Sequence, residues 1–79
     1  MEREDLQEII ELNGDAGIFL PGNSPHTQEF IGIHKDEQRG TWFVSGALVG
    51  DWVLHQYRDV EDLLDVLYQH YRESDVEGY

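Results

Sequence analysis

Histidine, serine and cysteine, the residues that most often act as zinc ligands or nucleophiles, are few in this chain. It has four histidines, three serines and no cysteine, namely His26, His34, His55, His70, Ser24, Ser45 and Ser74. No two histidines are three to five residues apart, which is the usual local spacing of zinc ligands, so a metal site would need distant histidines. No serine lies in a nucleophile-elbow or triad motif. Lys35 is the single lysine, and no phosphate loop precedes it. We predict a protein that is not an enzyme and uses no metal or cofactor, with a metal-dependent activity of scattered histidines as the alternative.

Carboxylates are the one abundant functional group. The chain has 17 acidic residues against five Lys and Arg, which gives a formal net charge of −12. Six acids fall within residues 2–15 and seven within residues 59–77, so the charge is concentrated toward the two ends of the sequence. Rows of carboxylates can imitate nucleic-acid phosphates and attract surfaces lined by Lys and Arg. The charge predicts a basic protein partner and argues against direct binding to nucleic acid or to an anionic membrane.

Two other interpretations concern the same composition. The aromatic residues could form a stacking platform for bases, but single-strand binders combine such platforms with a basic groove, which this chain lacks. Core packing is the better interpretation for most of them. These aromatics are Trp42, Phe43, Trp52, Tyr57, Tyr68 and Tyr71. The acids could also serve solubility in a high-salt cytoplasm, which the single lysine suits equally well.

Two predicted helices have to position most of the acids. Residues 2–12 carry the short apolar stripe of a first helix, and Asn13 and Gly14 are a plausible stop because both tolerate the left-handed conformation. A second helix follows Asp59, whose carboxylate can cap the exposed amides of the first turn. Its apolar residues recur every three or four positions, at Val60, Leu63, Leu64, Leu67, Tyr68 and Tyr71. Asp59, Asp62 and Asp65 have helical spacing and share its exposed face.

Strands are predicted between the helices. Residues 17–20, 28–34, 41–44 and 52–57 are apolar, β-branched or aromatic, and the charged segment 35–40 reads as a hairpin turn. The fold class is therefore α+β, a small antiparallel sheet of three or four strands with an N-terminal and a C-terminal helix. Residues 1–79 form a single domain, in which residues 74–79 lack a pattern and are expected to fray. The predicted core is Val60, Leu63, Leu64, Leu67, Ile9, Ile10, Ile33, Val44 and Trp52.

The compartment follows from what the sequence lacks. There is no apolar run near the roughly 18 residues that span a membrane. The first residues are acidic and polar, unlike a secretory signal. We expect a cytoplasmic protein.

Four segments carry a resemblance to a known family. They are E-D-L-Q-E-I-I near the start, the loop N-S-P-H-T-Q, the acidic turn K-D-E-Q-R-G and the acidic run D-V-E-D that opens the last helix. In these segments, and in length, acidity and order of elements, the chain resembles the small acidic phage anti-CRISPR proteins that inhibit Cas9 as DNA mimics. In that family, acidic residues occupy the channel that reads the protospacer-adjacent DNA. The chain departs from it in a shorter last segment and in the two tryptophans of its strands. The resemblance implies partner contacts at Asp36, Glu37, Asp59, Glu61 and Asp62, and a host cytoplasm as the location.

The sequence thus predicts a non-enzymatic acidic inhibitor that occupies the DNA- or RNA-binding surface of a basic partner. A nuclease or another nucleic-acid-binding protein is the expected partner. The residues of this chain that are predicted to contact the partner are Asp36, Glu37, Asp59, Glu61, Asp62 and Asp65. A nuclease immunity protein and a small structural or oligomerising protein of a salt-adapted organism are the alternatives. A homodimer through an exposed sheet edge or through Trp42 stays open.

Overall fold

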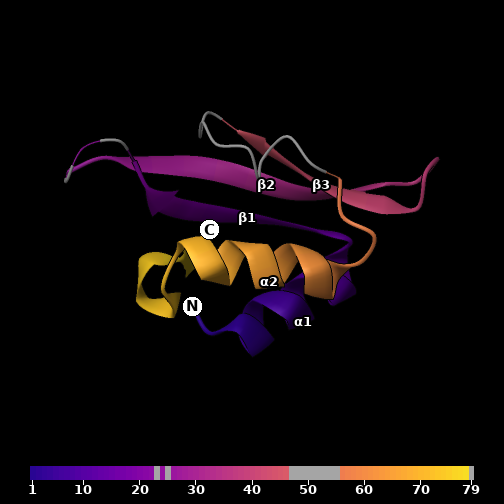
Figure 1. Cartoon of the computed structure of the whole chain (residues 1–79), viewed down its shortest axis with the longest axis horizontal. Helices are drawn as coiled ribbons and strands as arrows, with labels where there is room; N and C mark the ends of the chain where they lie inside the picture. Colours follow the sequence, from indigo (N-terminus) through magenta and orange to yellow (C-terminus); the bar gives the residue numbers. More distant parts are fainter. Residues whose placement is uncertain (23, 25, 47–55, 79) are drawn as a thin grey trace.

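The fold combines two helices with one antiparallel sheet. The computed structural model describes residues 1–22, 24, 26–46 and 56–78. In chain order the elements are α1 (Arg3–Asn13), β1 (Asp15–Pro21), β2 (Gln28–Asp36), β3 (Thr41–Gly46), α2 (Val60–His70), the 3-10 helix η2 (Glu73–Asp75) and β4 (Glu77–Gly78). Figure 1 shows the sheet as one layer and both helices as a second layer below it. The predicted α+β class, with a helix toward each end of the chain, is confirmed.

The sheet has the strand order β3-β2-β1-β4, and all of its pairs are antiparallel. The β2–β3 hairpin turns through residues 37–40, where Gly40 takes the left-handed φ of 67° that favours glycine. Its register pairs Asp36 with Thr41 and Ile33 with Val44. The strand predicted at 52–57 lies largely outside the described residues, although Tyr57 forms an isolated bridge with Trp42.

The hydrophobic core lies between the sheet and the helices. Alternate residues of β1 point into it, as the period of two along a strand requires, so Ala16, Ile18 and Leu20 are buried. Seven of the nine predicted core residues are buried, namely Val60, Leu63, Leu64, Leu67, Ile10, Ile33 and Val44. The prediction was wrong for Ile9, which is 36% exposed because α1 turns Leu6 and Ile10 toward the core. Trp52 lies outside the described residues.

The predicted helix ends are confirmed at two positions. Gly14 follows α1 with a left-handed φ of 77°, and its N–H donates to the Ile10 carbonyl oxygen at 2.8 Å. Asp59 precedes α2, and its Oδ1 accepts from the Asp62 N–H at 2.9 Å. Such a cap stabilises a helix by about 1 kcal/mol relative to alanine. Neither helix among the described residues has the length and apolar character needed to cross a bilayer.

The C-terminal segment is ordered, so the expected fraying of residues 74–79 was wrong for its described part. Residues Glu77 and Gly78 pair with β1, and Val76 is 1% exposed. The Met1 amino group donates to the carbonyl oxygens of Glu73 and Val76 at 2.6 and 2.5 Å. A single apolar residue in a polar tail produces no periodic pattern, which explains why the sequence did not reveal this packing.

Tyr68 is part of the same contact between the two ends of the described chain. Its hydroxyl donates to the Met1 carbonyl oxygen at 2.9 Å. Burial, and then the nearby Glu73 carboxylate, raise the pKa of Tyr68 from 10.0 to about 12. Because the folded-state pKa lies above the ordinary value, the folded state holds the proton more tightly. The resulting stabilisation is complete below pH 10 and is lost as the pH rises through about 12.

We therefore expect the free energy of unfolding to decrease between pH 10 and about pH 12. This decrease should be smaller in the Tyr68→Phe variant, because the ionisable hydroxyl is absent. Urea unfolding followed by circular dichroism, repeated from neutral pH to about pH 12, measures the free energy of unfolding of both proteins. Burial also raises the pKa values of Tyr57 and Tyr71, so the variant keeps a residual slope. Identical slopes in both proteins would show that Tyr68 is not buried in this contact.

Candidate functional site

The two helices carry a dense acidic surface. Both cover the same face of the sheet, so their outer sides form one surface, here called the helix layer (Figure 1). All acids of α1 and α2, and the acidic residue before each helix, are exposed. These nine acids are Glu2, Glu4, Asp5, Glu8, Glu11, Asp59, Glu61, Asp62 and Asp65. Arg3 is the one Lys or Arg within the two helices. The layer is therefore strongly negative at neutral pH.

Arg3 lies in the seam between the helices. Its guanidinium forms an ion pair with Asp65 at 2.5 Å and donates to the Glu61 carbonyl oxygen at 3.1 Å. Both side chains of the ion pair are partly exposed, and such pairs typically contribute about 0–1 kcal/mol. The contact therefore joins α1 to α2 but adds little to the stability of the fold.

The six predicted contact residues fall into two groups, and all of them except Asp65, which lies halfway along α2, are at one end of the molecule (Figure 1). They are Asp36 and Glu37 at the turn after β2, and Asp59, Glu61, Asp62 and Asp65 at the start of α2 and along it. Trp42 and Tyr57 exchange backbone hydrogen bonds of 2.8 and 2.7 Å, which holds the segment before α2 beside β3. Figure 1 shows the β2–β3 turn and the first turn of α2 at the same end.

Three of these six carboxylates have partners within the chain. Asp36 Oδ1 accepts from two backbone N–H groups of the turn at 3.1 and 3.3 Å. Asp59 caps α2, and Asp65 forms the ion pair described above. Within the described residues, no hydrogen bond or ion pair engages the side chains of Glu37, Glu61 and Asp62. The side chains of Asp36, Asp59 and Asp65 therefore already have partners within the chain, whereas those of Glu37, Glu61 and Asp62 remain available to another protein.

A hollow of about 400 Å³ lies where α1 and α2 approach β3. Its lining residues are Gln7, Glu11, Trp42, Asp59, Val60 and Glu61. It brings carboxylates from both helices together beside a partly buried tryptophan. Glu11 was not among the predicted contact residues. Glu11 lies at this hollow only because the two helices pack on the same face of the sheet, and that packing cannot be predicted from a pattern in the sequence.

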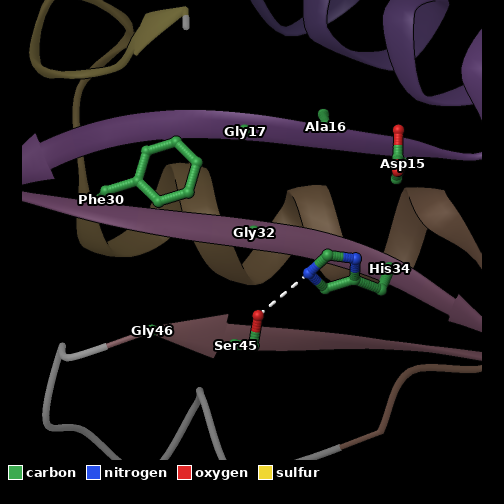
Figure 2. Close-up of a pocket in the computed structure, with 8 residues that line it drawn as sticks. All are labelled: Asp15, Ala16, Gly17, Phe30, Gly32, His34, Ser45 and Gly46. Atoms are coloured by element: carbon green, nitrogen blue, oxygen red, sulfur yellow. Dashed lines mark hydrogen bonds between the residues drawn. The ribbon is translucent and has the colours of Figure 1, made fainter.

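The opposite face of the sheet has a different chemistry. Gly17, Gly32 and Ser45 are register partners on β1, β2 and β3, and they form a row of small residues across three strands. Phe30 lies on one side of this row and His34 on the other (Figure 2). The result is an open hollow of about 280 Å³, here called the glycine trough. Its lining residues are Asp15, Ala16, Gly17, Phe30, Gly32, His34, Ser45 and Gly46.

The imidazole of His34 leans over Gly32 toward the neighbouring strand. Its Nε2 lies 2.9 Å from Ser45 Oγ, within hydrogen-bond distance (Figure 2). A Cβ atom at Gly32 would overlap Nε2, so this ring position requires glycine there. The ring centroids of His34 and Phe43 are 5.4 Å apart. The centroids of the cross-strand pair Phe19 and Phe30 are 5.3 Å apart and edge-to-face.

Ser45 lies in no recognisable sequence motif, and the spacing of the histidines predicts an isolated His34. The hairpin register could have joined them, because a turn at residues 37–40 sets Gly32 opposite Ser45 and puts His34 on the same face. A serine bonded to a histidine is the first link of a nucleophilic triad, and Asp15 is the register partner of His34. Within the described residues, however, no side chain hydrogen-bonds the other ring nitrogen of His34. Nor do three or more potential ligands come together there to hold a metal ion.

Comparisons with protein-family models, curated proteins and solved structures returned no match.

The Gly32→Ala variant tests the geometry of the trough. The new methyl group would collide with the imidazole and lie 3.2 Å from Ser45 Oγ, so the ring has to leave its hydrogen bond. We expect altered NMR signals of the His34 ring and a loss of about 1–3 kcal/mol in stability. Ser45→Ala is the matched control, which removes the hydrogen bond but leaves the space, with a loss of about 0.5–1.5 kcal/mol. Unchanged ring signals in Gly32→Ala would mean that the imidazole does not lie over Gly32.

Proposed function

We propose that this chain is a non-enzymatic acidic protein that binds a basic, nucleic-acid-binding protein and occupies its DNA- or RNA-binding surface. The observation that carries the proposal is the helix layer, in which nine exposed carboxylates lie on one side of the molecule. Its single guanidinium is engaged by Asp65. A surface of one sign attracts a Lys/Arg-lined channel and raises the rate of association.

The shape of the layer supports the same proposal. A small antiparallel sheet holds both helices from behind, so the carboxylates are presented by rigid elements and not by loops (Figure 1). Preorganised charge needs little ordering on binding, which favours affinity. Glu61 and Asp62 are the residues that we expect to contribute most, because they are exposed and no described side chain engages them.

The partner proposed most narrowly is an RNA-guided nuclease, inhibited in the host cytoplasm by a phage-encoded protein. This narrower form rests on the sequence resemblance. A nuclease bound by an immunity protein uses the same physics with a different partner.

A competition experiment tests the proposal. Immobilised protein is exposed to host lysate at about 50 mM salt, and bound proteins are eluted with short duplex DNA or RNA. We expect a nucleic-acid-binding protein to be retained, to be released by the nucleic acid, and to be lost at about 200 mM salt because exposed charges are screened. A retained protein that binds DNA or RNA and the chain simultaneously would contradict the proposal.

Matched charge variants sharpen this test. Glu61→Gln with Asp62→Asn removes two charges from the helix layer, whereas Glu29→Gln with Glu77→Gln removes two from the sheet. We expect the first pair to weaken binding about tenfold, which is about 1.4 kcal/mol, and the second to change it much less. Equal effects of both pairs would point to net charge alone.

Salt adaptation is the second candidate function, favoured by the same uncompensated carboxylates. It predicts that the protein unfolds as salt is removed, since like charges then repel without screening. The inhibitor proposal predicts a folded protein at about 0.1 M salt. Thermal unfolding followed by circular dichroism from low to molar salt decides between them. A cooperative transition that appears only in molar salt would favour salt adaptation.

A further inference from the structure

The junction between α1 and β1 presents an asparagine–glycine pair in an open position. Asn13 is the last residue of α1, and Gly14 alone separates it from Asp15, where β1 begins. The Asn13 side chain is exposed and has no hydrogen bond with another described residue. A Cβ atom at Gly14 would meet no atom within 4 Å. Within the described part of the chain, no side chain therefore covers the Asn13–Gly14 peptide bond.

An asparagine that precedes a glycine can react with its own backbone. The glycine nitrogen attacks the side-chain Cγ of the asparagine, a C–N bond forms and ammonia leaves, which produces a five-membered succinimide ring. Water then adds to one of the two ring carbonyls and opens the ring to aspartate or isoaspartate. Glycine favours the attack because it has no Cβ and reaches backbone conformations that other residues avoid. Water is the only co-reactant, and the chain supplies every other group.

The folded helix end opposes this reaction. The Gly14 N–H donates to the Ile10 carbonyl oxygen at 2.8 Å, so its nitrogen is engaged and is not free to attack Cγ. Asn13 is also held in the last turn of the helix by this bond, which closes the turn as a C-terminal cap. The ring can therefore form only after the last turn of α1 has opened.

Opening of this turn does not require the core to unfold. Ile10 is the last buried residue of α1, whereas Glu11, Leu12 and Asn13 are exposed, and Leu12 is 75% exposed. Helix ends fray, and a segment with few buried contacts opens at a lower free energy than the whole domain. The reaction therefore has a local route that leaves the contact between the helices and the sheet in place.

We propose that Asn13 is a site of spontaneous conversion to aspartate and isoaspartate, and that the opening of the last turn of α1 sets its rate. In isoaspartate the main chain runs through Cβ and Cγ, which adds one atom between residues 13 and 14. Gly14 is the whole connection to a strand whose first residue, Asp15, is paired with His34, so the junction has no slack to absorb that atom. The isoaspartate product therefore loses the bond from Gly14 to Ile10, whereas the aspartate product keeps it. This inference goes beyond the proposed function, because it concerns a covalent change at the helix end and not the binding of a partner.

Timed incubation of the full chain at mildly alkaline pH, with and without guanidinium chloride, tests the inference. Peptide mapping by mass spectrometry locates the conversion of carboxamide to carboxylate, and enzymatic methylation of isoaspartate counts that product. We expect conversion at Asn13, at least about tenfold faster in the denatured chain than in the folded one. Asn13→Gln should abolish it, because glutamine closes a six-membered ring much more slowly. Asn23→Gln, which replaces the other asparagine of the chain, is the matched control and should leave it unchanged.

The separated products test the role of the junction. We expect the isoaspartate form to unfold about 4–8 °C below the parent protein, which is the effect of one lost hydrogen bond in a domain of this size. The Asn13→Asp variant carries the same added charge on an ordinary main chain, and its Tm should fall less. The inference would be overturned by an unmodified Asn13 in the denatured chain, by equal rates in the folded and denatured chains, or by equal Tm values of the isoaspartate form and the variant.

Discussion

The packing of both helices on one face of the sheet is the contact on which the other features depend. Ile18, Ile31 and Leu64 are fully buried in it, and each such side chain contributes about 1.5–3 kcal/mol by leaving water. A short chain without disulfides has little else to offset the entropy of ordering. The same contact decides where the charges lie. Because the inner sides of the helices must be apolar, their acids can occupy only the outer sides, and two helices on one face combine them into one layer.

Such a concentration of like charge is tolerated because the helix dipoles partly offset it. Glu61 and Asp62 lie in the first turn of α2, where the unpaired backbone N–H groups carry partial positive charge. Glu11 lies in the last turn of α1, which is the unfavourable end for an acid. It nevertheless lines the same hollow as Asp59, at the N-terminal end of α2, and accepts a hydrogen bond from Gln7 at 3.1 Å. The positive end of one helix therefore lies near the acid at the negative end of the other.

Features with a local cause were predictable from the sequence, and features that depend on distant packing were not. The Asp59 cap, the Gly14 stop and the turn closed by Gly40 each follow from residues within a few positions. The burial of Val76 and the exposure of Ile9 depend on which distant element each residue meets. The same distinction between local and distant causes applies to the candidate site. The acids of α2 could be nominated from the sequence, whereas their internal partners and the contribution of Glu11 required the structure.

The β2 strand shows how one sequence can serve two surfaces. Its alternation sends Ile31 and Ile33 into the core and leaves Phe30 and His34 on the other face. Core packing explains the isoleucines. It does not explain the two opposed glycines, because glycine in a strand is less stable than alanine by about 0.5–1 kcal/mol. Gly32 is accounted for by the imidazole above it, which in turn forms one side of an open trough. On this face the sequence therefore gives up strand stability at Gly32 in favour of the His34 ring and its hydrogen bond to Ser45, and core packing plays no part in that choice.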